Sequence, residues 1–408
     1  MKEKLVCSIK GHPLAWAAAI VIPLAGILVS KAAAFGLAAI GFVSLAHRRG
    51  WTGWIAARPP RRAKPKQTPV PAPQRPRPPR SSGSDLVESM LAQGRHSLLL
   101  RPQVVDNLSE EQLRQTIVAL QDDMALVPAG HVALTYDALD PPQDAWDDGQ
   151  QDRALGCTVH VESVFLDRFA VTNKQYYEFV KNGGYEELAI WDEHVLPAML
   201  DFVDRTGHPG PRWWKDGAPP AGRLNHPVVG VCWYEAVAFA RWSGKRLPTD
   251  AEWTKAACWP VVIGAGNWVQ RKYPWGDTFA AEHSNLWVSG HRQTIPVDAC
   301  GTGISVGGVH QLVGNVWEWM SGAFGHPDDA SLALPAPMKG IRGGAFDTFF
   351  ENQATCQFQS GENPLRRKHN IGFRLALGAC DLAPRAAGLI LEDAFSPDDD
   401  AVLAEVNS

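Results

Sequence analysis

The chain has 408 residues, 45% of them hydrophobic and 20% charged, which is enough apolar sequence to bury a large globular core. Its formal net charge of −4 gives no indication of a polyanionic partner, and we expect no binding to nucleic acid. The seven cysteines are odd in number, widely spaced and without a C-x-x-C pair. The sequence therefore indicates neither a disulfide framework nor a zinc site.

Residues 14–46 form an apolar stretch that is interrupted near its middle by Lys31. The runs on either side have 17 and 15 residues, each slightly shorter than the ~20 residues that a membrane-spanning helix needs. Either one tilted span or a helical hairpin that turns near Lys31 fits this pattern. Basic residues are more numerous after the stretch, between Arg48 and Lys66, than before it. We therefore expect residues 1–50 to be a membrane segment and the large domain to face the cytoplasm.

Residues 51–84 are basic and rich in proline, which predicts an extended polyproline II linker. Such a linker could also contact a proline-binding module or anionic lipid. Residues 85–124 are expected to be helical. In this segment Ser109 is a typical N-cap and Gln112 stands at the third helical position, while apolar residues recur at helical spacing from Leu113.

Two further helices are predicted over residues 172–180 and 249–256. Each begins at a threonine, Thr172 and Thr249, whose side chain can accept a hydrogen bond from the first turn. Glycine and proline, which number 37 and 31 in the whole chain, recur through its C-terminal two-thirds, which indicates many turns and short strands.

Eight short motifs follow one another in the C-terminal two-thirds of the chain. They are residues 127–130 (VPAG), 169–173 (FAVTN), 226–228 (HPV), 246–253 (RLPTDAEW), 273–277 (YPWGD), 314–319 (GNVWEW), 342–346 (RGGAF) and 370–374 (NIGFR). In this order they resemble the formylglycine-generating enzyme (sulfatase-modifying factor) family from about Ala125 to Leu377. The resemblance implies an α+β, C-type-lectin-like fold in residues 125–380, with a small twisted antiparallel sheet, few helices and much loop. An acidic tail, residues 381–408, follows.

One feature of the family is absent from this sequence, a pair of cysteines. The family's oxidase uses two cysteines, five residues apart, shortly after its equivalent of Gly343-Gly344. The two possible alignments place these positions on Thr348 and Gln353, or on Phe346 and Glu351. Neither pair contains a thiol, and Cys356 matches a cysteine that the family does not use in catalysis. Because copper(I) is a soft ion that hydroxyl, amide and carboxylate groups hold poorly, we expect neither copper nor formylglycine-generating activity.

Three charged residues in the 246–253 motif, Arg246, Asp250 and Glu252, are candidate catalytic groups by residue type. The resemblance gives these positions structural roles instead. We therefore expect them to form a buried polar network that fixes loops.

The resemblance also implies calcium, a hard ion that prefers carboxylate and backbone oxygens. One site maps onto the side chains of Gln311 and Glu318 and the backbone carbonyls of Gly314 and Val316. Another would need Asn285, the Leu286 carbonyl and a nearby acidic residue, but residues 287–296 contain no Asp or Glu. We therefore expect one calcium ion, at the first of these sites.

The segment from Phe346 to His369 corresponds to the substrate groove of the family. Here it combines aromatic, amide and cationic side chains, a composition typical of recognition surfaces. The residues expected on this binding surface are Phe346, Thr348, Phe349, Phe350, Glu351, Gln353, Phe358, Arg366 and Arg367. Phe346 is also the phenylalanine expected to lie closest to the core. Because adjacent side chains of an extended segment point to opposite sides, at least one of Phe349 and Phe350 should face solvent.

We predict a sulfatase-modifying-factor-like domain without copper-binding thiols, tethered to a membrane by residues 14–46, that binds a protein or peptide ligand. The chain contains no nucleophile–base pair, H-E-x-x-H motif or phosphate-binding loop. One alternative is a family enzyme with non-thiol oxidative chemistry, although His96 is the single histidine in residues 85–124, where such relatives carry a His-rich helical domain. The others are a pseudo-enzyme that regulates a neighbouring enzyme and a lectin-like binding protein diversified by a retroelement.

Overall fold

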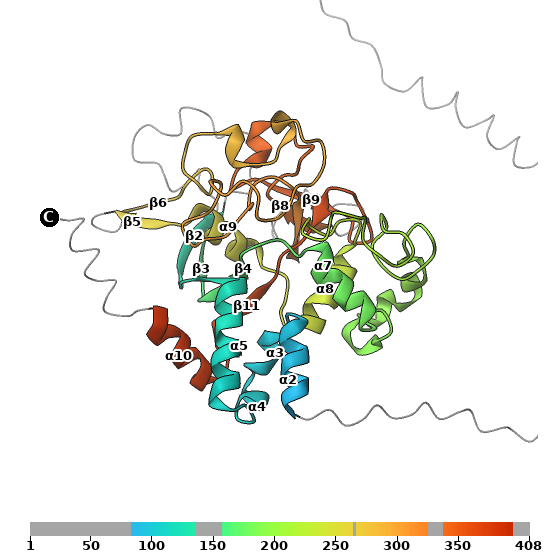
Figure 1. Cartoon of the computed structure of the whole chain (residues 1–408). Coiled ribbons are helices and arrows are strands. Elements are labelled where there is room, and N and C mark those ends of the chain that lie inside the picture. Colours follow the sequence, from blue (N-terminus) through green and yellow to red (C-terminus); the bar gives the residue numbers. More distant parts are fainter. Residues whose placement is uncertain (1–82, 135–156, 264–266, 325–337, 395–408) are drawn as a thin grey trace, which may run out of the picture. The chain divides into compact units, whose positions relative to one another are not determined.

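The computed structural model describes residues 83–134, 157–263, 267–324 and 338–394 (Figure 1). All of them belong to the second of the two compact units into which the chain divides, Pro78–Ser408. The predicted membrane segment and nearly all of the predicted linker lie outside the described residues, as do residues 395–408 of the tail. No helix within the described residues is long and apolar enough to cross a membrane.

The fold is of the α+β class, and its first sheet joins the beginning and the end of the domain. Strands β1 (Met124–Val127), β4 (Val164–Asp167) and β11 (Ala376–Gly378) are antiparallel in the order β1-β4-β11. Leu166 pairs with Ala125 on one side and with Ala376 on the other. All four residues of β4 are buried, as expected for a central strand covered on both faces.

The second sheet brings the last three motifs together. Its order is β10-β7-β8-β9, with β10 (Ile371–Gly372) parallel to β7 (Trp317–Ala323). Strand β8 (Lys339–Arg342) is antiparallel to both β7 and β9 (Gln359–Glu362). Motifs that are separated in the sequence therefore lie side by side on neighbouring strands.

Two hairpins complete the strands of the described residues. Strand β2 (Gly130–Leu134) pairs with β3 (Cys157–Val161), and β5 (Val261–Ile263) pairs with β6 (Asn267–Val269). Figure 1 shows the β5–β6 hairpin extending outward from the rest of the fold.

Local hydrogen bonds start three of the helices where the sequence predicts. Helices α5 (Glu110–Asp123), α7 (Asn173–Lys181) and α9 (Asp250–Cys258) each begin with a capping box, in which the N-cap side chain and the third helical residue exchange hydrogen bonds. The N-caps are Ser109, Thr172 and Thr249, which confirms these three predictions.

The remaining helices of the described residues are mostly short. They are α2 (Gly83–Ala92), α3 (His96–Leu99), α4 (Pro102–Val105), α8 (Trp233–Ser243) and α10 (Pro384–Ala394), with 3-10 turns η3 (Leu188–Ile190), η4 (Glu193–Asp201), η5 (Ala281–His283), η6 (Trp287–Ser289), η8 (Glu351–Ala354) and η9 (Ala379–Asp381).

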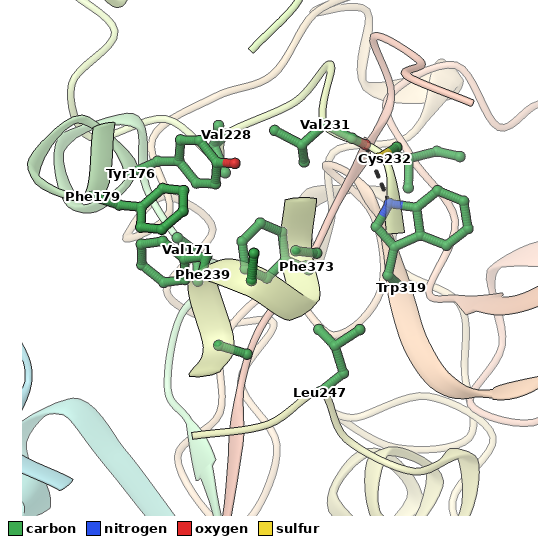
Figure 2. Close-up of a cluster of buried hydrophobic side chains, with 14 of the residues drawn as sticks. Val171, Tyr176, Phe179, Val228, Val231, Cys232, Phe239, Leu247, Trp319 and Phe373 are labelled. Carbon is green, nitrogen blue, oxygen red and sulfur yellow. Dashed lines mark hydrogen bonds between the residues drawn. The ribbon is translucent and has the colours of Figure 1, made fainter. Parts of the chain in front are cut away.

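The largest core cluster is rich in aromatic side chains and is shown in Figure 2. Tyr176 of α7 stacks on Phe239 of α8 with ring centroids 5.3 Å apart, and Phe373 meets Phe239 edge-on at 5.6 Å. Trp319 of β7 reaches the same cluster and donates its indole N–H to the carbonyl of Val231 at 3.4 Å. Such aromatic pairs stabilise the core by about 0.5–1.5 kcal/mol each beyond their area burial.

The helices of residues 83–123 pack onto the same domain. Leu113 and Leu120 of α5 are fully buried in a cluster that also contains Phe165 of β4 and Leu377 of β11. The Arg95 guanidinium lies 4.8 Å from the Trp242 ring centroid and donates to the Trp242 carbonyl. The first sheet is therefore covered by helices from both ends of the described chain.

Arginine–carboxylate pairs fix the loops between these elements. Arg246 donates two hydrogen bonds to Glu252, and Arg342, which is fully buried, donates two to Asp250. Arg342 also donates to the carbonyls of Cys356 and Gln357. Arg246, Asp250 and Glu252 thus all take part in ion pairs, as predicted, but the network is not wholly buried, because the Arg246 side chain is 42% exposed.

The motif 342–346 depends on the absence of a side chain at Gly343. Its φ is +97°, and a Cβ atom there would lie 2.5 Å from the backbone carbonyl oxygen of Leu312. Gly322 of β7 offers a matched control, because a Cβ atom there would have no neighbour within 4 Å.

We expect Gly343→Ala to lower the free energy of unfolding by about 1–3 kcal/mol or more, because it adds backbone strain and a backbone clash. Urea denaturation of the two alanine variants would measure this difference. Equal stability of the Gly343→Ala and Gly322→Ala proteins would contradict it.

Candidate binding surface

Thr348, which one of the two alignments places at a thiol position of the family, is a buried turn residue with 7% of its surface exposed. Its hydroxyl accepts a hydrogen bond from the Ala345 amide at 2.8 Å, and its own amide donates to the Ala345 carbonyl at 2.8 Å. These bonds close the loop that follows Gly344. The Thr348 side chain therefore stabilises the local backbone.

The two buried thiols near this segment, those of Cys258 and Cys356, are protonated at neutral pH. Burial raises the pKa of the Cys356 thiol well above its usual range, and it raises the pKa of the neighbouring Cys258 thiol to about 12. Both side chains lie within an apolar core cluster. Because the thiolate is the nucleophile and the metal ligand, neither cysteine fits a reactive role.

Phe349 and Phe350 are both strongly exposed, with 68% and 61% of their surfaces accessible. Their rings meet edge-on, with centroids 5.3 Å apart. The prediction that at least one of the pair faces solvent is confirmed. Contiguous exposed aromatic side chains are uncommon on monomeric proteins and often mark interaction sites.

The sequence did not predict that Trp287 joins this pair. Its ring centroid lies 6.3 Å from that of Phe349, it is 40% exposed, and its amide donates to the Thr348 carbonyl at 3.1 Å. The Arg292 guanidinium carbon lies 3.1 Å from the Trp287 ring centroid. We call Trp287, Phe349 and Phe350 the aromatic surface. Trp287 is 62 residues from Phe349 in the sequence, and their proximity follows from the folded structure, in which the Trp287 backbone contacts Thr348.

Tyr273 supports the segment at Glu351, directly after Phe350. Its hydroxyl donates to Glu351 at 2.6 Å, and its ring stacks on Trp275 at 5.3 Å. Burial, together with this bond to a carboxylate, raises the pKa of the Tyr273 phenol. The Gln353 amide donates to the Phe350 carbonyl at 3.1 Å. Glu351 and Gln353 thus support the aromatic surface.

Three of the residues predicted on the binding surface are buried, and these predictions are corrected. Phe346, Thr348 and Arg367 are 6%, 7% and 9% exposed, too little to contact a partner. Phe346 is covered because it continues from the buried 342–345 segment. Phe358 is half-buried and packs against Trp317, whereas Arg366 is exposed.

Arg367 is internal because it pairs with Glu235, which is fully buried on α8. Its guanidinium lies 2.8 Å from a Glu235 oxygen and also donates to the carbonyls of Val203 and Gly210. The ion pair therefore fastens the loop of residues 201–217 to the core.

The same loop is closed by the Asp204 carboxylate. It accepts four hydrogen bonds, from the amides of Thr206, His208 and Gly217 and from the Thr206 hydroxyl. Although burial on its own raises the pKa of Asp204, these bonds lower it to about 2.

A lowered pKa means that the ionised Asp204 stabilises the fold above its unfolded pKa, near ~3.9, and that this contribution is lost as pH falls through about 2. We expect Asp204→Asn to have a lower melting temperature than wild type at neutral pH. The difference should shrink between pH 4 and pH 2, as thermal scans at stepped pH would show. A difference that does not change with pH would contradict this role of the charge.

The predicted calcium ligands are bonded to protein groups. The Glu318 oxygens accept hydrogen bonds from Arg374 at 2.7 Å each and from the Trp253 indole at 2.7 Å. The Gln311 amide oxygen accepts from Asn315 at 2.7 Å. As arranged, these residues do not fit a calcium ion, because a guanidinium neutralises their single carboxylate. Calcium binding itself stays a prediction.

We expect Glu318→Gln to lower the free energy of unfolding by about 3–5 kcal/mol, because it leaves the buried Arg374 charge without its partner. The loss should be the same with calcium and with chelator. Glu88→Gln, on the exposed side of α2, is the matched control. A calcium-dependent rise in the wild-type melting temperature that Glu318→Gln abolishes would instead establish the calcium site.

Residues 109–379 match the family model described as "Sulfatase-modifying factor enzyme 1-like domain". The hercynine oxygenase of Mycolicibacterium smegmatis is 35% identical over 48% of this chain and 44% of its own length. The formylglycine-generating enzyme of Streptomyces coelicolor is 31% identical over 54% and 79%. The mouse inactive C-alpha-formylglycine-generating enzyme 2 is 29% identical over 63% and 86%. This chain therefore spans less than half of the hercynine oxygenase that it resembles.

Proposed function

We propose that this chain, which belongs to the sulfatase-modifying factor enzyme 1-like family, acts as a binding module for a protein or peptide and not as a formylglycine-generating oxidase. The observation that carries the proposal is the aromatic surface of Trp287, Phe349 and Phe350. It stands beside Thr348, one of the positions at which the two alignments with the family place a thiol.

The energetics of exposed aromatic rings support a binding role. Phe349 and Phe350 each leave more than half of their surface in water, although burial of such a side chain contributes about 1.5–3 kcal/mol. Aromatic side chains are enriched among the residues that dominate binding energy at protein interfaces. A partner that covers these rings would recover that free energy.

The rings are also held in place before any partner arrives. Trp287 is bonded through its backbone to Thr348, and the turn at Thr348 is closed by two hydrogen bonds. Glu351 is fixed by Tyr273 on the other side. A surface that is already ordered loses less conformational entropy on binding.

We further propose that residues 14–46 tether this module to a membrane, with the binding surface on the cytoplasmic side. The apolar stretch and the larger number of basic residues between Arg48 and Lys66 support this arrangement.

We expect the full chain to form no aldehyde on a Cys-x-Pro-x-Arg peptide, with or without copper, because no thiolate pair is available. Mass spectrometry of the peptide would measure this, with the Streptomyces coelicolor enzyme as the positive control. Aldehyde formed by the wild-type chain would contradict the proposal.

In parallel, Thr348→Cys/Gln353→Cys and Phe346→Cys/Glu351→Cys variants would show, by Cu(I) binding, which alignment of the lost thiols is right.

We expect a photo-crosslinking amino acid at Phe349 to give a discrete adduct in cells, because a partner covers this ring. Trp287→Ser and Phe350→Ser should each lower the adduct yield at least tenfold, since residues central to an interface cost 2 kcal/mol or more when truncated, about thirtyfold in affinity. The same crosslinker at Val118 on α5, which is also exposed, is the control. Equal yields at the two positions would rule out a specific site at Phe349.

A further inference from the structure

The loop that Arg367 and Asp204 hold carries two arginines around one tryptophan. The guanidinium carbons of Arg205 and Arg212 lie 5.3 and 5.5 Å from the Trp213 ring centroid, and the His369 ring lies edge-on at 6.5 Å. Guanidinium groups at this distance are attracted to the electron-rich face of an aromatic ring. Trp213 is therefore a platform that orders two cations.

The platform is fixed to the core. A Cβ atom on Gly230 would lie 2.5 Å from Cδ1 of Trp213, so the edge of the indole rests against the backbone there. The Arg212 amide donates to the Gly230 carbonyl at 2.9 Å, and the Arg205 amide donates to the Trp214 carbonyl at 3.3 Å. The positions of both arginines are thus set by the backbone.

Arg205 and Arg212 differ from four other arginines of this domain. Arg246, Arg342, Arg367 and Arg374 are each paired with a carboxylate. Within the described ranges, neither Arg205 nor Arg212 is paired with a carboxylate, and both side chains are exposed. Two cations held near one ring attract an anion to this part of the surface, and the planar guanidinium fork of either one matches a carboxylate.

The surroundings limit the charge of that anion. Asp204 lies on the same loop, Asp216 is 3.9 Å from Lys215, and Asp347 is 3.5 Å from His369. The whole chain carries a net charge of −4. These carboxylates disfavour the closely spaced phosphates of nucleic acid, whereas a flexible acidic peptide can place one or two of its carboxylates on the arginine pair and keep the others in solvent.

The arginine pair is connected to the binding segment through His369. Its ring lies 5.7 Å from that of Phe346, which precedes Phe349 by three residues. We infer that Arg205 and Arg212, ordered on Trp213, bind a carboxylate of an acidic peptide segment in the partner that the aromatic surface recognises. This inference rests on the proposed function.

The test uses the full chain and three probes: hexaglutamate, hexaglutamine and inorganic phosphate, each titrated by calorimetry at low salt. We expect hexaglutamate to bind, and Arg205→Gln/Arg212→Gln to weaken it at least tenfold. Trp213→Leu keeps both charges and should weaken it severalfold, because the platform is lost. Lys174→Gln/Lys181→Gln removes the same charge from exposed positions of α7 and should leave the affinity unchanged.

Unchanged hexaglutamate affinity in the arginine variant, or an equal loss in the lysine variant, would overturn the inference. Phosphate that binds as tightly as hexaglutamate would also overturn it, in favour of a phosphate site. Circular dichroism melting of each variant confirms that the fold is intact. Phe349→Ser/Phe350→Ser should not change hexaglutamate binding, because this probe has no apolar side chain. If hexaglutamate does not bind, the crosslinking result at Phe349 is unaffected. If the crosslink at Phe349 is absent, the hexaglutamate result is likewise unaffected.

Discussion

The buried ion pair between Arg374 and Glu318 is the interaction on which the two main sheets depend. Glu318 belongs to β7 of the second sheet, and the same guanidinium donates to the carbonyl of Asp167, the last residue of β4 in the first. The Trp253 indole of α9 completes the carboxylate's partners. Both charges are fully buried, so removing one leaves the other without compensation, which costs far more than an exposed pair. Three of the eight sequence motifs meet at this one group.

Because the domain is held by this pair and by Arg342 with Asp250, its stability does not depend on thiols in the segment after Gly344. Thr348 closes the local turn with its hydroxyl, a role that requires an oxygen and no metal. Phe349 and Phe350, in contrast, stand on the part of the segment that faces solvent. This scaffold is therefore compatible both with the absence of a thiol pair from this segment and with an exposed aromatic surface on it.

The sequence predicted the features that short-range hydrogen bonds decide. Ser109, Thr172 and Thr249 bond to residues three positions away, so a local pattern is sufficient to place the helix starts. It failed where distant residues decide. Arg366 and Arg367 are identical in type and adjacent, yet only Arg367 is internal, because Glu235 reaches it from 132 positions away. Likewise, nothing near Phe349 in the sequence reveals Trp287, and nothing near His369 reveals Trp213.

Long-range contacts also order the exposed aromatic and cationic groups on loops, without regular secondary structure. Each exposed group stands on a loop that a buried polar group holds: Arg367 and Asp204 hold the loop of Trp213, and Thr348 and Tyr273 hold that of Phe349. Loops tied down in this way keep their side chains in place without a partner, and less entropy is lost when one binds. The buried polar network therefore stabilises the fold and, by the same hydrogen bonds, orders the residues that we assign to recognition.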